Sequence, residues 1–531
     1  MSSGFIRKIS PWPARSPEDK KKGSIFIVTI FSFFIFSVLA LSLIFLSQLY
    51  LRLGGYRKNS ALLDYSSENG IKEGFHRLMQ AVSGASLPAV ISEEKYNQLG
   101  DNTRNAEPRI VEETLGLHLP VDIQETGERM TWRSKTSGLL EKISEGETFF
   151  SARFKLSINS EGGLKNFLPK RASSLETRLE ILAGHIPLPM IPFLISKNMD
   201  LEEKENFEAN NPIDFVRRPD NLLVPQASIV GEGLIPQDAA PLLEKALDIK
   251  IFRPQDLTNA RLRAALGLEN SQEPVPEGVY LIQNDLGLGG IYIQGDVKEM
   301  ITAIEQDFQV ISFQMDAGVW IIKFSPEQGK TYFDTPDGAR AYDLVPLGFI
   351  IVSGKIESLG GGTVDPTGNI CLIKDKEVAS ILQGINLTII ASDTVNISSH
   401  LLRQGVKWQE GVPYVKEENA QLLIFSTGRD FQDGQMKEGG ITIDENAPQE
   451  IKIQAGLTAQ GEGFKILGEK KTVRILGSLQ TSDYLSGGSQ LEITPLLLFT
   501  SLKDSSFSAP ATAEPVLFLS SFESLEWKEY Y

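Results

Sequence analysis

Cysteine is almost absent from this sequence, which has one, Cys371, among 531 residues. A single thiol cannot form a bridge within the chain, so a disulfide framework is excluded. The domains must therefore be held together by burial of apolar side chains. Because Cys371 stands between Ile370 and Leu372, we predict a buried thiol on a strand.

Histidine is also scarce, and its spacing does not indicate chemistry. No two histidines have the spacing of a zinc-binding helix such as H-E-x-x-H, and no Ser or Cys elbow lies near His400. We expect structural or surface roles for all of them, and neither a catalytic residue nor a metal nor a cofactor. The four are His76, His118, His185 and His400.

Positive charge is in deficit, with 52 Lys and Arg against 68 Asp and Glu, a formal net charge of −16. This balance argues against nucleic acid and anionic lipid head groups as partners. Gly287-x-Gly289-Gly290 does not open a helix, so we predict a turn between strands there and not a phosphate loop.

Long apolar runs are missing except for one. Residues 25–46 contain no charge, Pro or Gly. As a helix this run would cover roughly the 30 Å hydrocarbon core of a membrane. A cleaved signal peptide is the competing interpretation, but its apolar region is shorter and ends at a small-x-small site, which residues 46–50 lack.

Charged residues around the run predict its orientation. The cations before it are more numerous than those directly after it, which places the N-terminus in the cytoplasm and the body outside. Before the run stand Arg7, Lys8, Arg15, Lys20, Lys21 and Lys22, and after it Arg52, Arg57 and Lys58.

An amphipathic stalk helix is predicted beyond the membrane, to about residue 83. Its small residues allow close approach either to its own domain or to neighbouring helices. They are Ser66, Ser67, Gly70 and Gly74. Gly54 and Gly55 weaken the helix and predict a hinge.

The fold class predicted for the whole chain is α+β, mainly β. We expect a cytoplasmic leader over residues 1–23 and a transmembrane and stalk helix over 24–83. A small β-rich domain over 84–200 and a linker with short helices over 201–278 follow. Residues 279–531 form a larger C-terminal β domain with many short strands. Stacked coils of a β-solenoid are favoured for it, and an antiparallel β-sandwich is the alternative.

Acidic residues in the C-terminal part are the candidates for a calcium or carbohydrate site, because such sites use carboxylate clusters. Solvated acidic turns are the alternative interpretation. The candidates are Asp393, Asp430, Asp433, Asp444 and Glu445.

The N-terminal residues carry a resemblance. A charged leader that ends in Gly23, then Ser24, then an uninterrupted apolar helix resembles a class III prepilin signal, which a membrane peptidase cuts after the glycine. Downstream, the sequence is similar to the signature of PilX-type minor pilins and related pilus assembly proteins. The matching residues are Ala61, Tyr65, Ser67, Glu68, Asn69, Gly70 and Ile71.

The resemblance covers about the first 80 residues and implies a non-enzymatic minor pilin. Such a protein would act in assembly, priming or decoration of a type IV pilus or related filament. Other pilins, pilus assembly proteins and prepilin peptidase would be its partners. Major pilins carry a Glu at the fifth residue after the cut, where this chain has Val28, so a low-copy tip or membrane-resident role is expected.

Two other functions stay open. One is a membrane-tethered β-solenoid that binds or cleaves carbohydrate, and the other is an envelope scaffold that never enters a filament. The C-terminal part is similar to an uncharacterised β-rich domain found after PilX-type anchors. This similarity does not decide between the carbohydrate-active protein and the scaffold.

Overall fold

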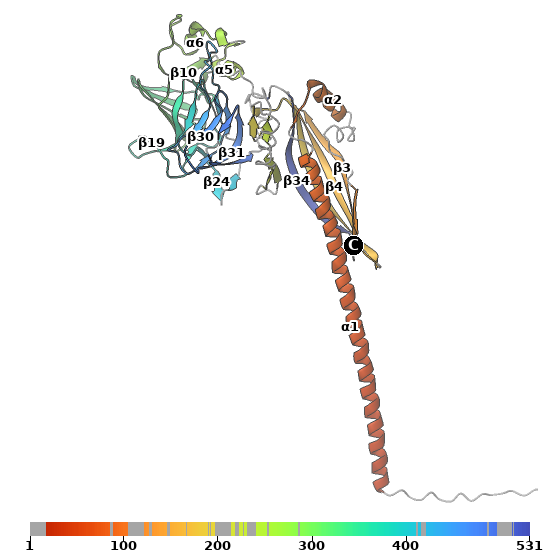
Figure 1. Cartoon of the computed structure of the whole chain (residues 1–531). Helices are drawn as coiled ribbons and strands as arrows, with labels where there is room; N and C mark the ends of the chain where they lie inside the picture. The colour runs from red at the N-terminus through yellow and green to blue at the C-terminus, as the bar shows by residue number, and fades with distance from the viewer. Residues whose placement is uncertain are drawn as a thin grey trace, which may run out of the picture.

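The computed structural model describes α1 and most of the strands. The described residues are 17–84, 89–104, 122–126, 130–145, 149–165, 167–188, 191, 193–196, 214–217, 222–226, 228–230, 240–251, 254–284, 287–409, 412–415, 421–485, 488–495, 512 and 515–530. The predicted class is confirmed: the chain is mainly β, with one long apolar helix at its N-terminus (Figure 1).

Helix α1 (Pro17–Gly84) runs without a break through Gly54 and Gly55, where the sequence suggested a hinge. The absence of Pro between residues 18 and 84 lets its backbone hydrogen bonds run uninterrupted. Its apolar part is bare, with Phe33 75 % and Phe36 70 % exposed. By length and composition, α1 is long and apolar enough to cross a membrane.

The end of α1 packs on the first sheet, whose order is β2-β3-β4-β5-β34-β8-β7, with β1 paired to β34. Long antiparallel strands β3, β4 and β5 form its centre. The helix α2 (Glu93–Arg104) follows β1. The strands are β1 (Ala89–Val90), β2 (Asp122–Thr126), β3 (Met130–Glu145), β4 (Phe149–Leu164), β5 (Phe167–Gly184), β7 (Asp214–Arg217), β8 (Leu222–Gln226) and β34 (Val516–Tyr530).

The last strand of the chain belongs to this first sheet. Residues 516–530 were predicted to lie in the C-terminal β domain, but β34 pairs with β5, β8 and β1. Pairing between segments so far apart leaves no local mark in the sequence. The predicted linker also differs, because it contributes strands β7, β8 and β9.

A second sheet has the order β10-β11-β17-β21-β26-β29-β31-β6-β9 and is parallel from β11 onward. Its first pair, β10 and β11, is antiparallel. Gly287, Gly289 and Gly290 were predicted to form a turn between strands, but they lie within β11, which pairs with β10. The strands are β6 (Phe193–Ile195), β9 (Ser228–Val230), β10 (Gly278–Asn284), β11 (Gly287–Gln294), β17 (Phe349–Val352), β21 (Asn386–Ala391), β26 (Gln421–Ser426), β29 (Gly456–Ala459) and β31 (Thr472–Thr481).

A third sheet runs β16-β15-β14-β13-β12-β18-β22-β27-β30-β32, with β19 paired to β18. It is antiparallel from β16 to β12 and parallel from β12 to β32. The strands are β12 (Glu299–Glu305), β13 (Phe308–Met315), β14 (Gly318–Ser325), β15 (Lys330–Thr335), β16 (Gly338–Tyr342), β18 (Ile356–Val364), β19 (Ile370–Leu372), β22 (Val395–Ile397), β27 (Ile441–Ile443), β30 (Phe464–Ile466) and β32 (Tyr484–Leu485).

Shorter parallel pairs lie outside the strand orders given above. Strand β20 pairs with β23, and β31 pairs with both β28 and β33. A parallel bridge from Leu401 to Ile453 connects them. Beside them lies the antiparallel hairpin of β24 and β25. The bounds are β20 (Ala379–Ile381), β23 (Leu402–Arg403), β24 (Val406–Gln409), β25 (Val412–Val415), β28 (Glu450–Ile453) and β33 (Gln490–Pro495).

Apolar residues at matched register form continuous rows across the parallel strands. Branched side chains stack on their own kind from strand to strand and pack the core densely. In the second sheet the row is Ile291, Ile350, Ile389, Ile424, Leu457 and Leu479. In the third sheet it is Met300, Leu359, Ile397, Ile443 and Ile466. The parallel register does not fit an antiparallel sandwich, and the solenoid stays a prediction.

Short helices cover the outer face of the second sheet, where sequence reasoning predicted them. They are α5 (Ala240–Leu247), the 3-10 turn η2 (Pro254–Asp256) and α6 (Asn259–Ala265). Leu243 and Leu262 pack with Ile351 and Phe425 of the sheet in one buried cluster. The Thr258 hydroxyl caps α6 by accepting a hydrogen bond from the backbone of Arg261.

Removing buried atoms from one of these rows should destabilise the β body. Ile443 is completely buried, so Ile443→Ala should lower the free energy of unfolding by about 2–5 kcal/mol. Leu344→Ala is the matched control, because Leu344 is 47 % exposed, and its effect should stay within about 0.5 kcal/mol. Guanidinium unfolding of the detergent-solubilised chain measures both, and equal midpoints would contradict the proposed packing.

Candidate functional site

The pilin-like segment of α1 lies where the helix meets the first sheet. Ser67, Gly70 and Ile71 face the sheet and are buried. Ala61 and Tyr65 are exposed, and Glu68 and Asn69 are half-buried. The helical period of 3.6 residues produces this division, because positions three and four apart share a face. The signature residues therefore divide into a sheet-facing set and an outward-facing set.

The helix approaches the sheet very closely. A Cβ added at Gly70 would lie 2.0 Å from the Ser160 Oγ, and one added at Gly74 would lie 2.3 Å from the Ser134 Oγ. From the other side, a Cβ at Gly162 of β4 would lie 2.4 Å from the backbone nitrogen of Ser67. Such distances leave no room for a side chain. The surface that the small residues of α1 approach is the protein's own sheet.

Hydroxyl groups join the helix to the sheet. The Ser67 and Ser173 hydroxyls are 2.9 Å apart, and the Ser66 hydroxyl donates to the Thr131 carbonyl at 2.8 Å. Both serines of the helix are almost completely buried. Each hydrogen bond contributes about 1 kcal/mol net, and leaving one partner unpaired would cost about 1–3 kcal/mol. These contacts therefore fix the rotation and the height of α1 on the sheet.

An ion pair between α1 and β5 helps to orient the helix on the sheet. Arg171 of β5 pairs with Asp64 of α1, Nε to Oδ1 at 2.9 Å, and its Nη2 donates to the Ser60 hydroxyl at 3.3 Å. On the outward side, Lys72 Nζ lies 3.9 Å from Glu68 Oε2 at the surface of the helix, and an ion pair of this kind contributes little to stability. Sequence reasoning identified the helical half of this junction and missed the sheet half. The sequence signal for the sheet half of the junction is a small residue at every second position of a strand, as at Ser160 and Gly162.

A side chain at Gly70 should separate the helix from the sheet. Gly70→Val places a Cβ 2.0 Å from the Ser160 Oγ, 3.1 Å from the Ser160 Cβ and 3.2 Å from the Trp132 ring, and its methyl groups add to this crowding. The expected loss is about 1–3 kcal/mol of unfolding free energy, seen as a lower unfolding midpoint.

Gly54→Val is the matched control, since nothing lies within 4 Å of a Cβ there. It places the same residue in the same helix away from the sheet. Equal shifts for the two variants would show that helix propensity alone acts at Gly70.

The predicted cleavage position lies inside α1. Gly23 and Ser24 belong to its first turns, and their side chains fall outside the described ones. Val28 is 60 % exposed on the bare part of the helix.

Four of the five acidic candidates accept hydrogen bonds from backbone N–H groups. Asp444 Oδ1 accepts a hydrogen bond from the backbone of Asn446, and Asp433 Oδ1 accepts one from Gln435. Asp393 Oδ1 accepts from the backbones of Thr394 and Gly439. Hydrogen bonds of this kind hold side chains in turns and need no ligand.

Asp430 is held by a cation. Its Oδ2 lies 3.0 Å from Lys437 Nζ, and its Oδ1 accepts from the backbone of Gln432 at 2.9 Å. Burial works to raise the pKa of Asp430, but these contacts together lower it below its ordinary value. In the part of the chain that the structure describes, no three His, Cys, Asp or Glu residues gather as a metal site would need. The five candidate carboxylates, Glu445 included, do not converge there.

Three of the four histidines lie in the described part, and His118 lies outside it. His400 is 6 % exposed, and its Nδ1 accepts a hydrogen bond from the backbone of Lys452 at 3.1 Å. His185 bridges the Thr512 carbonyl and the Glu93 carboxylate. Both His400 and His185 hold neighbouring segments together through hydrogen bonds. His76 is exposed.

Protonation of His400 should weaken the fold. Burial lowers the pKa of His400, so the folded state prefers the neutral ring. The unfolded chain therefore binds more protons below pH about 6.5, and stability falls as the pH drops through that value. His400→Gln should reduce the loss of melting temperature between pH 7.5 and about 5.5.

The control is His76→Gln, the same substitution at an exposed histidine of α1, which shows how much of any change comes from replacing a histidine elsewhere. If both variants keep the wild-type slope, His400 does not contribute to it.

The prediction for Cys371 is wrong, because the thiol is exposed. Strand β19 pairs only with β18 within the described residues and carries Cys371 on its open side. Its neighbours Ile370 and Leu372 point the other way and are half-buried. Apolar neighbours in sequence therefore did not indicate burial at this edge.

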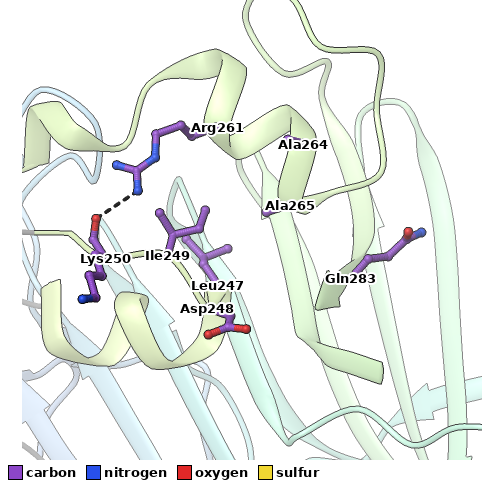
Figure 2. A pocket seen from close by; sticks show the side chains of 8 residues that line it. All are labelled: Leu247, Asp248, Ile249, Lys250, Arg261, Ala264, Ala265 and Gln283. Atoms are coloured by element: carbon purple, nitrogen blue, oxygen red, sulfur yellow. Dashed lines mark hydrogen bonds between the residues drawn. The ribbon is translucent and has the colours of Figure 1, made fainter. Parts of the chain in front are cut away.

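An open hollow of about 520 Å³ lies between α5, the residues after it, and α6 (Figure 2). Leu247, Ile249 and Ala265 supply apolar lining. The guanidinium of Arg261 donates to the Lys250 carbonyl at 3.1 Å and to the Asp256 carbonyl at 2.7 Å. Its donors thus stabilise the connection between the helices.

Comparison of the chain with known protein families, curated proteins and solved structures finds no match.

Proposed function

We propose that this protein is a membrane-anchored exported protein of the minor pilin type. It acts in assembly, priming or decoration of a type IV pilus or a related filament. Its apolar helix end lies in the cytoplasmic membrane, with the leader in the cytoplasm and the β body outside. Other pilins, pilus assembly proteins and prepilin peptidase are the partners proposed for it.

One observation carries the proposal: α1 is a single helix with two different halves. The first half is apolar and bare, with Phe31 and Phe34 more than 60 % exposed, and the second half is seated on an antiparallel sheet through small residues. An apolar surface of this extent on a soluble monomer would be a liability, whereas lipid or other apolar helices would cover it. The same helix thus supplies both the anchor and the attachment of the body.

Val28 supports a low-copy role. A carboxylate at that position in major pilins is thought to pair with the N-terminal amine of a neighbouring subunit. Without it, an amine buried in a filament core would lack its partner, at considerable cost. A subunit at the tip, or one that remains in the membrane, need not bury its amine among neighbours.

The β body is proposed to present a surface to partners and not to catalyse a reaction. Four of the five acidic candidates accept hydrogen bonds from backbone groups, and no specific observation favours carbohydrate cleavage. An envelope scaffold that never enters a filament shares every structural feature described above. Processing of the N-terminus separates that function from the pilin-type function.

The N-terminal sequence of the protein isolated from cells tests the proposal. In cells with prepilin peptidase the chain should begin at Ser24, and in cells without the peptidase it should retain residues 1–23. Gly23→Val should abolish cleavage even when the peptidase is present, because the peptidase acts after glycine.

Gly54→Val is the control here too, since it lies in the same helix but away from the cut and should be processed normally. Retention of residues 1–23 in peptidase-containing cells would remove the pilin interpretation and leave the membrane scaffold.

A further inference from the structure

The first sheet is completed by the last strand of the chain. β34 lies in the interior of the sheet, between β5 and β8, and not at its edge. It pairs with β5 from Val516 opposite Gly184 to Tyr530 opposite Ala172. On its other side it pairs with β8, Phe522 opposite Leu223, and with β1, Val516 opposite Val90.

Several described elements join the sheet only through β34. Strand β1 pairs with β34 alone, and β8 pairs with β34 and β7. Without β34, the long strand β5 would present an unpaired edge from Phe167 to Gly184. An open edge of that length is a template for another strand.

The start of the strand is anchored as well. The backbone of Thr512 donates to the Ile186 carbonyl at 2.9 Å, and its hydroxyl accepts from the backbone of Ile186. The Pro515 carbonyl accepts from Ile91. Thr512 and Val516 are almost completely buried. The site for the C-terminal segment is therefore specific in register, and any copy of the same segment would fit it.

The covalent connection does not dictate which copy supplies the strand. Residues 496–511 separate β33 from the anchored Thr512, and 16 residues can span roughly 53–58 Å when extended. A terminal element on a long connection is the kind of element that protein copies exchange at little cost. Within one chain the local concentration of β34 is on the order of millimolar, so exchange requires copies that are equally crowded.

We propose that the slot between β5 and β8 accepts the C-terminal strand of a second copy of this chain, so that crowded neighbours exchange β34. The crowding rests on the membrane-resident form of the proposed function, in which copies gather in the membrane, and not on a single copy at a filament tip; the strand exchange does not depend on peptidase processing. An exchanged pair keeps every hydrogen bond of the first sheet, because both sheets are completed by identical segments. Neighbouring copies become linked near the stalk, and their outer bodies stay free.

Cross-linking between two full-length variants tests the exchange. Thr177 of β5 lies opposite Ser524 of β34, and both are small. One variant carries Thr177→Cys and a second carries Ser524→Cys, each with Cys371→Ser to remove the native thiol. The two are produced together in the same cells, and isolated membranes are mildly oxidised.

A disulfide-linked species of twice the chain mass, formed only when both variants are present, is the expected result. The single chain that carries both cysteines should form the bridge internally, which shows that the geometry is competent. Bridging in that single chain with no linked pair between the variants would overturn the proposal. The pair Ser174→Cys and Lys528→Cys, also opposite in register, gives a second reading at another point of the strand.

Discussion

The close seating of α1 on the first sheet is the contact on which the rest of the structure depends. Glycines and serines on the helix meet serines and Gly162 on the strands, so the two backbones approach without intervening side chains. Hydrogen bonds between hydroxyls and the Arg171–Asp64 ion pair then fix the orientation. Because α1 is one uninterrupted helix, whatever holds its apolar end also determines where the whole β body is placed.

The two β parts of the molecule differ in how they are stabilised. The parallel strands are held by continuous rows of buried branched side chains, with Ile389 and Ile424 as typical members. The first sheet instead combines long antiparallel strands with a polar helix contact, and it needs the final strand β34. Apart from β6, which lies in sequence between β5 and β7, the parallel strands lie between β8 and β34. Most of the β body is therefore an insertion within the sheet on which α1 is seated.

Features that depend on neighbouring residues could be predicted from the sequence, and features that depend on distant pairing could not. The long apolar helix, its continuation with Ser67 and Gly70 on one face, and the short helices near residues 240–265 follow from composition and periodicity. The sheet that receives Gly70 and the position of β34 require partners far along the chain. Cys371 shows the same limit, because its exposure follows from its place on an edge strand and not from its apolar neighbours.

The location of the β body is the central claim, and the native Cys371 measures it directly. It is the sole thiol in the sequence and is exposed on β19. A maleimide that cannot cross the cytoplasmic membrane is added to cells whose outer envelope is opened and whose cytoplasmic membrane is intact. Labelling of Cys371 under these conditions is the predicted result. Labelling only after the cytoplasmic membrane is broken would place the body inside the cell and contradict the account.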